Sequence, residues 1–288
     1  MFEQLGLIGC GLMGGSFALA LRRRGLVRRI VGYSPRRQSL ERALAMGAID
    51  IAASSPFDAT SGADLVLIAV PVSATAATFA AIRDTLTPRT LLMDVGSTKC
   101  DVVDAALQTL GEHLESFVPA HPIAGKECAG IEHADAELYA GRQVILTPLE
   151  QGRTDLLQAA ETLWTALGST VVRTTPQEHD AAFAAVSHLP HLVAFAAMNA
   201  ILGQTHAAEY LALAGPGFRD FTRIAASDPA VWRDILLANR ANVLQQCEHL
   251  HSQLQAFTTA MRAGDAPALD SLLHRASTAR ARWTMTSS

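Results

Sequence analysis

Residues 9–16 read Gly-Cys-Gly-Leu-Met-Gly-Gly-Ser, a glycine-rich turn between two apolar runs. The run before it, residues 5–8, has the length of a buried parallel strand, and the run after it, residues 17–22, has the composition of a helix. A strand, a G-x-G-x-x-G turn and a helix in this order form the context that a dinucleotide-binding fingerprint requires. This stretch therefore predicts a Rossmann-type unit.

The glycines of this turn have separate predicted roles. Gly9 permits the tight turn, Gly11 lets the backbone approach a pyrophosphate, and Gly14 lets helix and strand pack closely. The pyrophosphate would sit on free N–H groups at the start of the helix, which adds Leu12 and Met13 to the predicted cofactor site. Glycine-rich turns also serve plain strand–helix packing, but the flanking elements favour a bound dinucleotide.

The residues after the second predicted strand, 30–33, bear on the choice of cofactor. NAD-binding folds usually carry an acidic residue near the end of this strand, where it bonds the ribose 2′-hydroxyl. Ser34 stands there instead, followed by Arg36 and Arg37, and a serine with two arginines could accept a 2′-phosphate. We therefore assign these three residues to the cofactor site, for NAD or NADP, and favour NADP. The alternative is ordinary helix initiation, with Ser34 as N-cap and Pro35 at the first helical position.

Apolar runs typical of strands recur along the chain and alternate with helical patterns. This alternation predicts an α/β domain with a mainly parallel sheet. Because ligands gather at the carboxyl ends of such strands, Val70 and Pro71 join the predicted cofactor site. The strand-like runs lie at residues 65–70, 91–95, 117–120, 143–146 and 170–173, and the helical patterns at 74–86, 100–113 and 154–167.

The composition indicates a compact globular protein. Of the 288 residues, 49% are hydrophobic and 17% charged, and a net charge of −4 without an extended basic block argues against a nucleic-acid partner. The four cysteines have neither metal-ligand nor disulfide spacing, so we expect no metal site and a reducing compartment. We recognise neither a signal peptide nor an apolar stretch of the ~20 residues that a membrane helix needs. These features predict a soluble cytoplasmic protein without a membrane partner.

The sequence changes character at residue 175. Residues 175–178, Thr-Pro-Gln-Glu, form a capping box with proline in the first turn, which predicts a helix start, and no convincing strand follows. We therefore divide the chain into a dinucleotide-binding Rossmann domain, 1–174, and an all-α domain, 175–288.

Apolar residues spaced alternately by four and three predict a coiled-coil-like seam on one long helix of the second domain, ending near Gly264. The pattern starts from Leu236, seven residues earlier, and its members are Val243, Cys247, Leu250, Leu254, Phe257 and Met261. Such a seam is either the core of a helical bundle or a subunit interface. We favour a helical domain that also forms a homodimer.

His121 is the first candidate for chemistry. It follows a buried strand at the ligand-binding edge of the sheet, and Pro122 forces it into an extended backbone conformation. Because histidine titrates near neutral pH, it could take a proton from a hydroxyl while hydride leaves the same carbon. Ser97, at the end of the preceding strand, could orient the histidine or a substrate hydroxyl, or could simply cap the next helix.

A second cluster lies around residues 178–191. Pro190 removes a helical hydrogen bond, which predicts a kink or break in the helix. His179 and His191 would lie ~120° apart on a straight helix and share a face only if the kink swings them together. Their spacing is not one of a metal site, and His188 could be a solvated surface histidine.

A third cluster lies at residues 215–223. Arg219 and Arg223 are four residues apart and would face the same way on a helix, where a guanidinium could bind a substrate carboxylate. They could equally be surface arginines. Trp232 could wall a pocket or fill the helical core.

Five motifs in sequence make the chain resemble the prephenate/arogenate dehydrogenase family of tyrosine biosynthesis. The matches run from residue 6 to about residue 235 and so cover most of the chain. They are the turn at 9–16, Asp-Val-Gly-Ser-Thr-Lys at 94–99, His-Pro-Ile-Ala-Gly at 121–125, Ser-His-Leu-Pro-His at 187–191 and Asp-Phe-Thr-Arg-Ile-Ala at 220–225.

The resemblance implies a Rossmann domain, a helical dimerisation domain and NAD(P)-dependent oxidative decarboxylation of prephenate or arogenate. It makes His121 the catalytic base, with Ser97 beside it, and Arg223 the ligand of a substrate carboxylate. It also implies that His179, His191 and Trp232 line the substrate pocket. No fused chorismate mutase or regulatory module is expected.

Other functions remain open at this stage. A β-hydroxyacid-type dehydrogenase would need a lysine from the helical domain, and the chain has none after Lys126. A non-catalytic NADP(H)-binding sensor would need the glycine turn but not His121 with Arg223. The sequence does not decide between prephenate and arogenate, which differ at one carbon, or between NAD and NADP, and it carries no sign of feedback by tyrosine.

Overall fold

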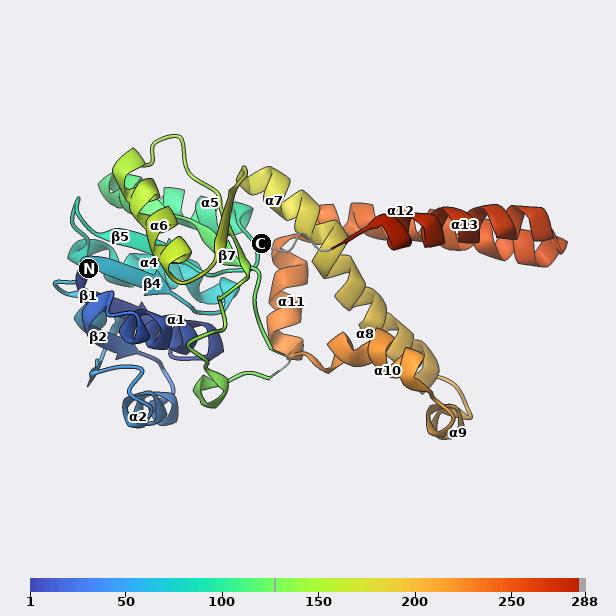
Figure 1. Cartoon of the computed structure of the whole chain (residues 1–288), viewed down its shortest axis with the longest axis horizontal. Coiled ribbons are helices and arrows are strands. Elements are labelled where there is room, and N and C mark those ends of the chain that lie inside the picture. The colour runs from blue at the N-terminus through green and yellow to red at the C-terminus, as the bar shows by residue number, and fades with distance from the viewer. Residues whose placement is uncertain (127, 285–288) are drawn as a thin grey trace.

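The computed structural model describes residues 1–126 and 128–284 and has two parts, an α/β domain and a helical domain (Figure 1). The α/β domain is built on a six-stranded sheet in the order β3-β2-β1-β4-β5-β6, with every neighbouring pair parallel. This is the doubly wound order in which the connection reverses between β1 and β4. The strands are β1 (Phe2–Ile8), β2 (Val27–Tyr33), β3 (Ile51–Ala52), β4 (Leu65–Ile68), β5 (Leu91–Asp94) and β6 (Phe117–Val118).

Side chains alternate between the two faces of the sheet and build two hydrophobic cores. Leu5, Leu7 and Leu65 belong to the core beneath α1, α2 and α6, whereas Ile8 and Val66 belong to the core beneath α3, α4 and α5. The sheet is therefore covered on both faces, as a parallel sheet of continuous apolar strands requires. The helices are α1 (Leu12–Arg23), α2 (Arg37–Ala45), α3 (Pro56–Thr60), α4 (Thr75–Ile82), α5 (Cys100–Thr109) and α6 (Thr154–Ala166).

A second, three-stranded sheet follows, in the order β7 (Ala120–Pro122), β8 (Gln143–Leu146) and β9 (Thr170–Arg173). β7 is antiparallel to β8, and β8 is parallel to β9. The predicted strand at residues 117–120 is thus two strands in different sheets. Pro119 lies between them, and since proline has no N–H to continue a ladder, the chain changes sheets there. The predicted mainly parallel α/β fold is confirmed, with this one division.

The helical domain begins as predicted at the Thr175–Glu178 capping box, where Thr175 Oγ1 accepts the Glu178 N–H and the Glu178 carboxylate accepts the Thr175 N–H. One helical segment then runs from Pro176 to Leu202 through a π-helical turn. The elements are α7 (Pro176–Phe183), the π-turn (Ala184–His188), α8 (Leu189–Leu202), α9 (Ala207–Ala212), α10 (Pro216–Thr222), the 3₁₀ turn η6 (Arg223–Ala226), α11 (Pro229–Ala238), α12 (Arg240–Ala263) and α13 (Ala266–Arg282).

The predicted seam spans two helices rather than one. Leu236 lies on α11, and α12 begins only at Arg240, because the chain turns at Asn239. α12 ends as predicted at Gly264, which takes the left-handed conformation with φ 62°. The helices α12 and α13 lie side by side and project away from the α/β domain, with Leu254 53% and Met261 58% exposed (Figure 1).

One helical segment among the described residues, Pro176–Leu202, is long and apolar enough by composition to cross a membrane. This differs from the expectation that no apolar stretch reaches that length. The segment combines exposed apolar residues, such as Val186 (72% exposed), with buried polar ones, such as His188 (1% exposed). The segment thus turns apolar side chains outward and contributes polar side chains to a buried cluster, which is described below.

Candidate active site

The glycine turn of residues 9–16 has the geometry of a phosphate-binding turn. Gly9 has φ 106°, and a Cβ atom there would lie 2.2 Å from the Ala69 carbonyl oxygen. A Cβ on Gly14 would lie 2.1 Å from the Gly9 oxygen, whereas one on Gly11 would meet no atom within 4 Å. No side chain caps the start of α1 at Gly11. The space over Gly11 and the uncapped N–H groups fit a dinucleotide pyrophosphate.

The predicted cofactor residues gather around this turn. The backbone of Val70, at the end of β4, lies within 3.2 Å of a Cβ built on Gly9, and Pro71 follows it. The N–H groups of Leu12 and Met13 belong to the uncapped first turn of α1. The turn and Val70 follow β1 and β4, which are neighbours at the switch point of the sheet. Doubly wound folds bind their ligands at this point.

The residues after β2 differ in detail from the prediction. Helix α2 begins at Arg37, so Ser34 is not its N-cap and Pro35 is not its first residue. Ser34 Oγ instead accepts the Arg36 N–H at 3.4 Å. Arg37 forms an ion pair with Glu41 one turn later, at 2.8 Å, while the Arg36 side chain is exposed. Among the described residues, the Arg37 guanidinium is therefore paired with a carboxylate, whereas the Arg36 guanidinium is not.

His121 lies at the centre of β7, opposite Ile145 of β8. The residue before it, Ala120, is held on both sides: its N–H donates to Asp94 Oδ1 at 3.0 Å, and its carbonyl accepts from Lys99 Nζ at 2.8 Å. Asp94 and Lys99 also form an ion pair with each other, and both side chains are buried. These bonds fix the backbone that presents His121.

Ser97 lies in the loop between Asp94 and Lys99, so the same two residues position it beside β7. Its side chain is half-buried and makes no hydrogen bond within the part of the chain that the structure describes. Ser97 and His121 thus sit on adjacent segments at the carboxyl end of the main sheet. Each follows a strand of the main sheet, as the sequence indicated, but His121 itself lies within a strand, β7, and the roles of the pair stay predictions.

A chain of hydrogen bonds runs from His121 into the helical domain. His121 Nδ1 is 2.8 Å from His179 Nε2, and His179 Nδ1 is 2.8 Å from Asp180 Oδ1. The two Asp180 oxygens also accept the N–H groups of Lys99 at 2.8 Å and Cys100 at 2.9 Å, at the start of α5. Asp180 therefore joins α7 to the α/β domain and holds His179 against His121.

Burial sets the ionisation of this cluster. It lowers the pKa of His121 well below the usual value, and the nearby His179, Lys99 and His188 lower it further. Burial also lowers the pKa of His179, although the bond to Asp180 opposes it. Burial alone would raise the pKa of Asp180, but the bonds from His179, Cys100 and Lys99 outweigh it and leave this pKa lowered. The cluster is thus an ionised carboxylate beside neutral imidazoles.

The sequence predicted a kink or break at Pro190. The helix does not break there but passes through the π-turn at Ala184–His188 just before this proline. His188 is 1% exposed, so the interpretation of it as a solvated surface residue is wrong. Its Nδ1 accepts from Asn239 Nδ2 at 3.1 Å, and Asn239 Nδ2 also donates to the Asp180 carbonyl at 2.7 Å. Burial lowers the pKa of His188 to about 4.

His191 and Trp232 form a second wall next to this cluster. Their rings are stacked, with centroids 3.6 Å apart and an interplanar angle of 19°. His191 Nδ1 donates to the Ser187 carbonyl at 2.9 Å, so its Nε2 is left as an acceptor. Trp232 also makes an edge contact with His188, at 6.1 Å. The structure therefore brings together His188 from the end of the π-turn, His191 from α8 and Trp232 from α11.

Arg223 opens the 3₁₀ turn η6, which packs against α8, the helix that carries His191. Its side chain is exposed. The α/β and helical domains also meet directly where Ser73 Oγ, two residues after Pro71, donates to Asp234 Oδ2 at 2.6 Å. Asp234 lies two residues after Trp232, so this bond links the cofactor side of the site to the substrate side.

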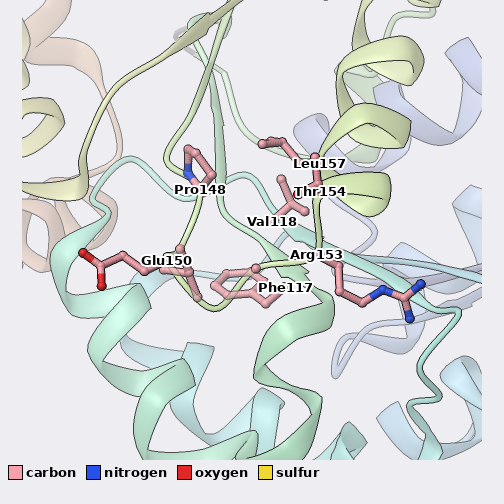
Figure 2. A pocket seen from close by; sticks show the side chains of 9 residues that line it. Phe117, Val118, Pro148, Glu150, Arg153, Thr154 and Leu157 are labelled. Carbon is pink, nitrogen blue, oxygen red and sulfur yellow. The ribbon is translucent and has the colours of Figure 1, made fainter.

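Figure 2 shows a cavity in the α/β domain. It has a volume of about 210 Å³ and is bordered by β6, the loop after β8 and the start of α6, where Glu150 and Arg153 point to opposite sides. None of its lining residues belongs to the predicted site. The chemistry is therefore assigned from the hydrogen-bonded cluster around His121 rather than from this cavity.

Comparison with known families places this geometry in context. Residues 17–173 match the family model "Prephenate dehydrogenase, nucleotide-binding domain", and residues 175–275 match "Prephenate dehydrogenase, dimerization domain". The chain belongs to the prephenate dehydrogenase family. Like other members of that family it is a dehydrogenase that uses a nicotinamide cofactor.

Individual relatives in the prephenate dehydrogenase family match most of the chain. The chain is 35% identical to prephenate dehydrogenase of Bacillus subtilis, over 92% of this chain and 72% of the relative. It is 31% identical to cyclohexadienyl dehydrogenase of Zymomonas mobilis, over 92% and 90%. Among solved structures, prephenate dehydrogenase from Aquifex aeolicus in complex with hydroxyphenyl propionate and NAD⁺ superposes with a TM-score of 0.89, at 34% identity and 97% coverage of both chains. Arogenate dehydrogenase of Synechocystis superposes with a TM-score of 0.82, at 27% identity and with coverage of 98% and 100%.

Several residues of this dehydrogenase site were missed by the sequence interpretation. Asp180 was noted only as part of the Glu178–Asp180 run, and Asp94 and Lys99 only as the ends of a motif. Their adjacency to histidine or to a strand end was visible, but the partners that they bind were not. Asn239 gave no local signal, because it reaches His188 and Asp180 across 51 and 59 residues.

Proposed function

We propose that this member of the prephenate dehydrogenase family catalyses NAD(P)-dependent oxidative decarboxylation of prephenate, arogenate or both, in the biosynthesis of L-tyrosine. The observation that carries the proposal is His121, held as a neutral imidazole in β7 next to the end of β5, in the same domain as the glycine turn that fits a dinucleotide. A base and a hydride acceptor are the two components that oxidation of a ring alcohol needs.

In the proposed reaction, the bound nicotinamide supplies the hydride acceptor. His121 Nε2 takes the proton of the ring hydroxyl while the C–H electron pair leaves as hydride, and the C=O bond forms. The ring carboxylate then departs as CO₂, its bonding electrons make the ring aromatic, and the former ketone oxygen takes up a proton to become the phenol. Ser97 orients the hydroxyl toward His121.

Three of the remaining predicted residues, Arg223, His191 and Trp232, would hold the substrate, whereas both ring nitrogens of His179 are already hydrogen-bonded. Arg223 would orient a substrate carboxylate, since a guanidinium fork suits a carboxylate in a bidentate geometry. His191 offers an unbonded Nε2 acceptor, and the stacked Trp232 supplies a flat apolar wall for the ring.

For the cofactor, we propose a preference for NADP. An acidic residue that would repel a 2′-phosphate is absent at position 34, and the Arg36 guanidinium is exposed beside it, whereas Arg37 is already paired with Glu41. Arg36→Ala should raise the KM for NADP⁺ more than that for NAD⁺. Arg37→Ala is the matched control and should have the smaller effect.

We further propose that the protein is a soluble cytoplasmic homodimer. The second matched family model is a dimerization domain, and the projecting α12 and α13 carry apolar side chains with no cover inside the described chain. A partner copy would bury them, as it would bury the exposed face of Pro176–Leu202. We keep the division at residues 174 and 175 as the proposed domain boundary.

The proposed reaction is tested by following the near-ultraviolet absorbance of the reduced nicotinamide with purified protein. Four mixtures are compared: prephenate or arogenate, each with NAD⁺ or NADP⁺. Reduction in any mixture supports the reaction class, and the pattern gives both preferences. No reduction in all four, from protein that still binds the cofactor, would favour the alternative of a non-catalytic sensor.

The role of His121 is tested with His121→Asn, which keeps a polar side chain but removes the base. We expect cofactor affinity to stay unchanged and kcat to fall by about 10²-fold or more. Normal turnover by this variant would exclude His121 as the base.

A further inference from the structure

His179 is placed behind His121 rather than beside a substrate. It is 1% exposed, and both of its ring nitrogens are already occupied, one by His121 and one by Asp180. The ring is also stacked on Phe183, at 4.4 Å between centroids. A side chain in this position has no free atom to offer a substrate, so its influence on the reaction must pass through His121.

The hydrogen-bond chain has only one consistent arrangement of protons. Asp180 is ionised and accepts two backbone N–H groups of α5, so its bond to His179 must also be an accepted one. His179 therefore carries its proton on Nδ1, and its Nε2 is an acceptor. His121 must then donate from Nδ1 to His179 Nε2, which leaves His121 Nε2 without a proton.

We propose that the Asp180–His179 pair is a positioning device that holds His121 in the tautomer with a bare Nε2 and stabilises its cation after proton transfer. The inference rests on the proposed function, because it takes His121 as the base. When His121 Nε2 gains the hydroxyl proton, the ring becomes an imidazolium whose Nδ1–H still donates to His179. The positive charge is then balanced by the Asp180 carboxylate through the His179 ring, and no proton has to leave His179.

The charges around His121 make this support necessary. Lys99 and His188 face it from the α5 start and the π-turn, His179 and Asp180 from α7, and Asp94 from the end of β5. Asp94 is already neutralised by Lys99. Asp180 is therefore the carboxylate left to balance a proton on His121.

Asp180→Asn tests the tautomer directly. In either orientation the new amide NH₂ faces a backbone N–H of Lys99 or Cys100, and in one of them it also donates to His179 Nδ1 and so reverses both histidines. The expected readout is the ¹⁵N shift of the His121 ring in cofactor-free protein, assigned by its loss in His121→Asn. We expect Nδ1 to be protonated and Nε2 bare in the parent, with the pattern reversed or mixed in Asp180→Asn. A bare Nδ1 in the parent protein would overturn the proposal.

A double-mutant cycle tests the pathway through His121 in the assembled enzyme and covers the case in which Asp180→Asn does not fold. His179→Phe keeps a ring against Phe183 but has no acceptor, and it should lower kcat by about 10²-fold with the cofactor KM unchanged. Added to His121→Asn, the same substitution should change kcat by no more than about twofold, because its target is already gone. A full additional loss in the double variant would show a structural role and overturn the proposal. Normal turnover by His179→Phe would do the same, whereas normal turnover by His121→Asn would instead refute the proposed base.

Discussion

Lys99 Nζ lies 2.5 Å from Asp94 Oδ2, and neither side chain is more than 3% exposed. A buried ion pair contributes little net free energy, but removal of one partner leaves an uncompensated charge in the interior. Lys99→Met should therefore lower the free energy of unfolding by about 3–5 kcal/mol in denaturant titrations.

The double variant Asp94→Asn/Lys99→Met is the matched control, because it removes both charges. It should recover a large part of the lost stability, while turnover stays low because Ala120, and with it His121, loses its clamp. If Lys99→Met alone were as stable as the parent, the Asp94 carboxylate would not depend on Lys99 for its charge balance, which would contradict this account of the ion pair.

The glycines of the dinucleotide turn should separate stability from cofactor affinity. Gly14→Ala forces a Cβ against the Gly9 carbonyl and should destabilise the protein by about 3 kcal/mol or fail to fold. Gly11→Ala meets no protein atom, so the thermal midpoint should hold while the Kd for the cofactor rises by about tenfold, or ~1.4 kcal/mol. Calorimetric unfolding gives the thermal midpoint, and cofactor titration gives the Kd. Equal affinity in Gly11→Ala and the parent would remove Gly11 from the pyrophosphate site.

The buried histidines should make the fold sensitive to mild acid. The pKa of His188 falls from 6.5 to about 4 on folding, so the folded state excludes a proton that the unfolded state binds. Above pH 6.5 this histidine does not lower the free energy of unfolding. As the pH falls from 6.5 toward 4, protonation of the unfolded state lowers that free energy by about 3 kcal/mol. Unfolding free energies measured across this range should decline less steeply in His188→Gln. The exposed His274→Gln is the control and should keep the parent slope.

The projecting helices should hold the dimer together. Leu254→Asp places a charge on the exposed apolar seam of α12 and should shift the protein toward monomer in light scattering after size exclusion. Leu107→Asp, on a leucine of α5 that is 49% exposed, controls for the loss of surface hydrophobicity and should leave the assembly intact. A Leu254→Asp protein with the parent mass would place the interface elsewhere.

The features that the sequence predicted are those set by local patterns. The glycine turn, the apolar strands and the Thr175 capping box each depend on residues within a few positions, and each is found where it was expected, except that the predicted strand at 117–120 is divided between two sheets. The placement of Ser97 after β5 followed from a rule about strand ends, which is also local, whereas His121 lies within the separate strand β7.

The features that were missed depend on distant partners or on boundaries. The contact of His121 with His179 joins residues 58 positions apart, and nothing in either neighbourhood specifies it. The apolar period continues from Leu236 into α12, so the break at Asn239 was invisible to periodicity. Pro190 did signal a disturbed helix, but a missing N–H does not say whether the helix bends, ends or widens into a π-turn.

The π-turn at Ala184–His188 has a consequence for how this stretch can change in length. Such a turn holds one residue more than the α-helical turn that it replaces, so the two halves of the Pro176–Leu202 segment are out of phase. Deletion of one residue from this turn would restore a regular helix and rotate α8 relative to α7 by roughly 100°. His191 would then turn away from Trp232. The length of this segment should therefore be fixed, even where its side chains are not packed against the rest of the chain.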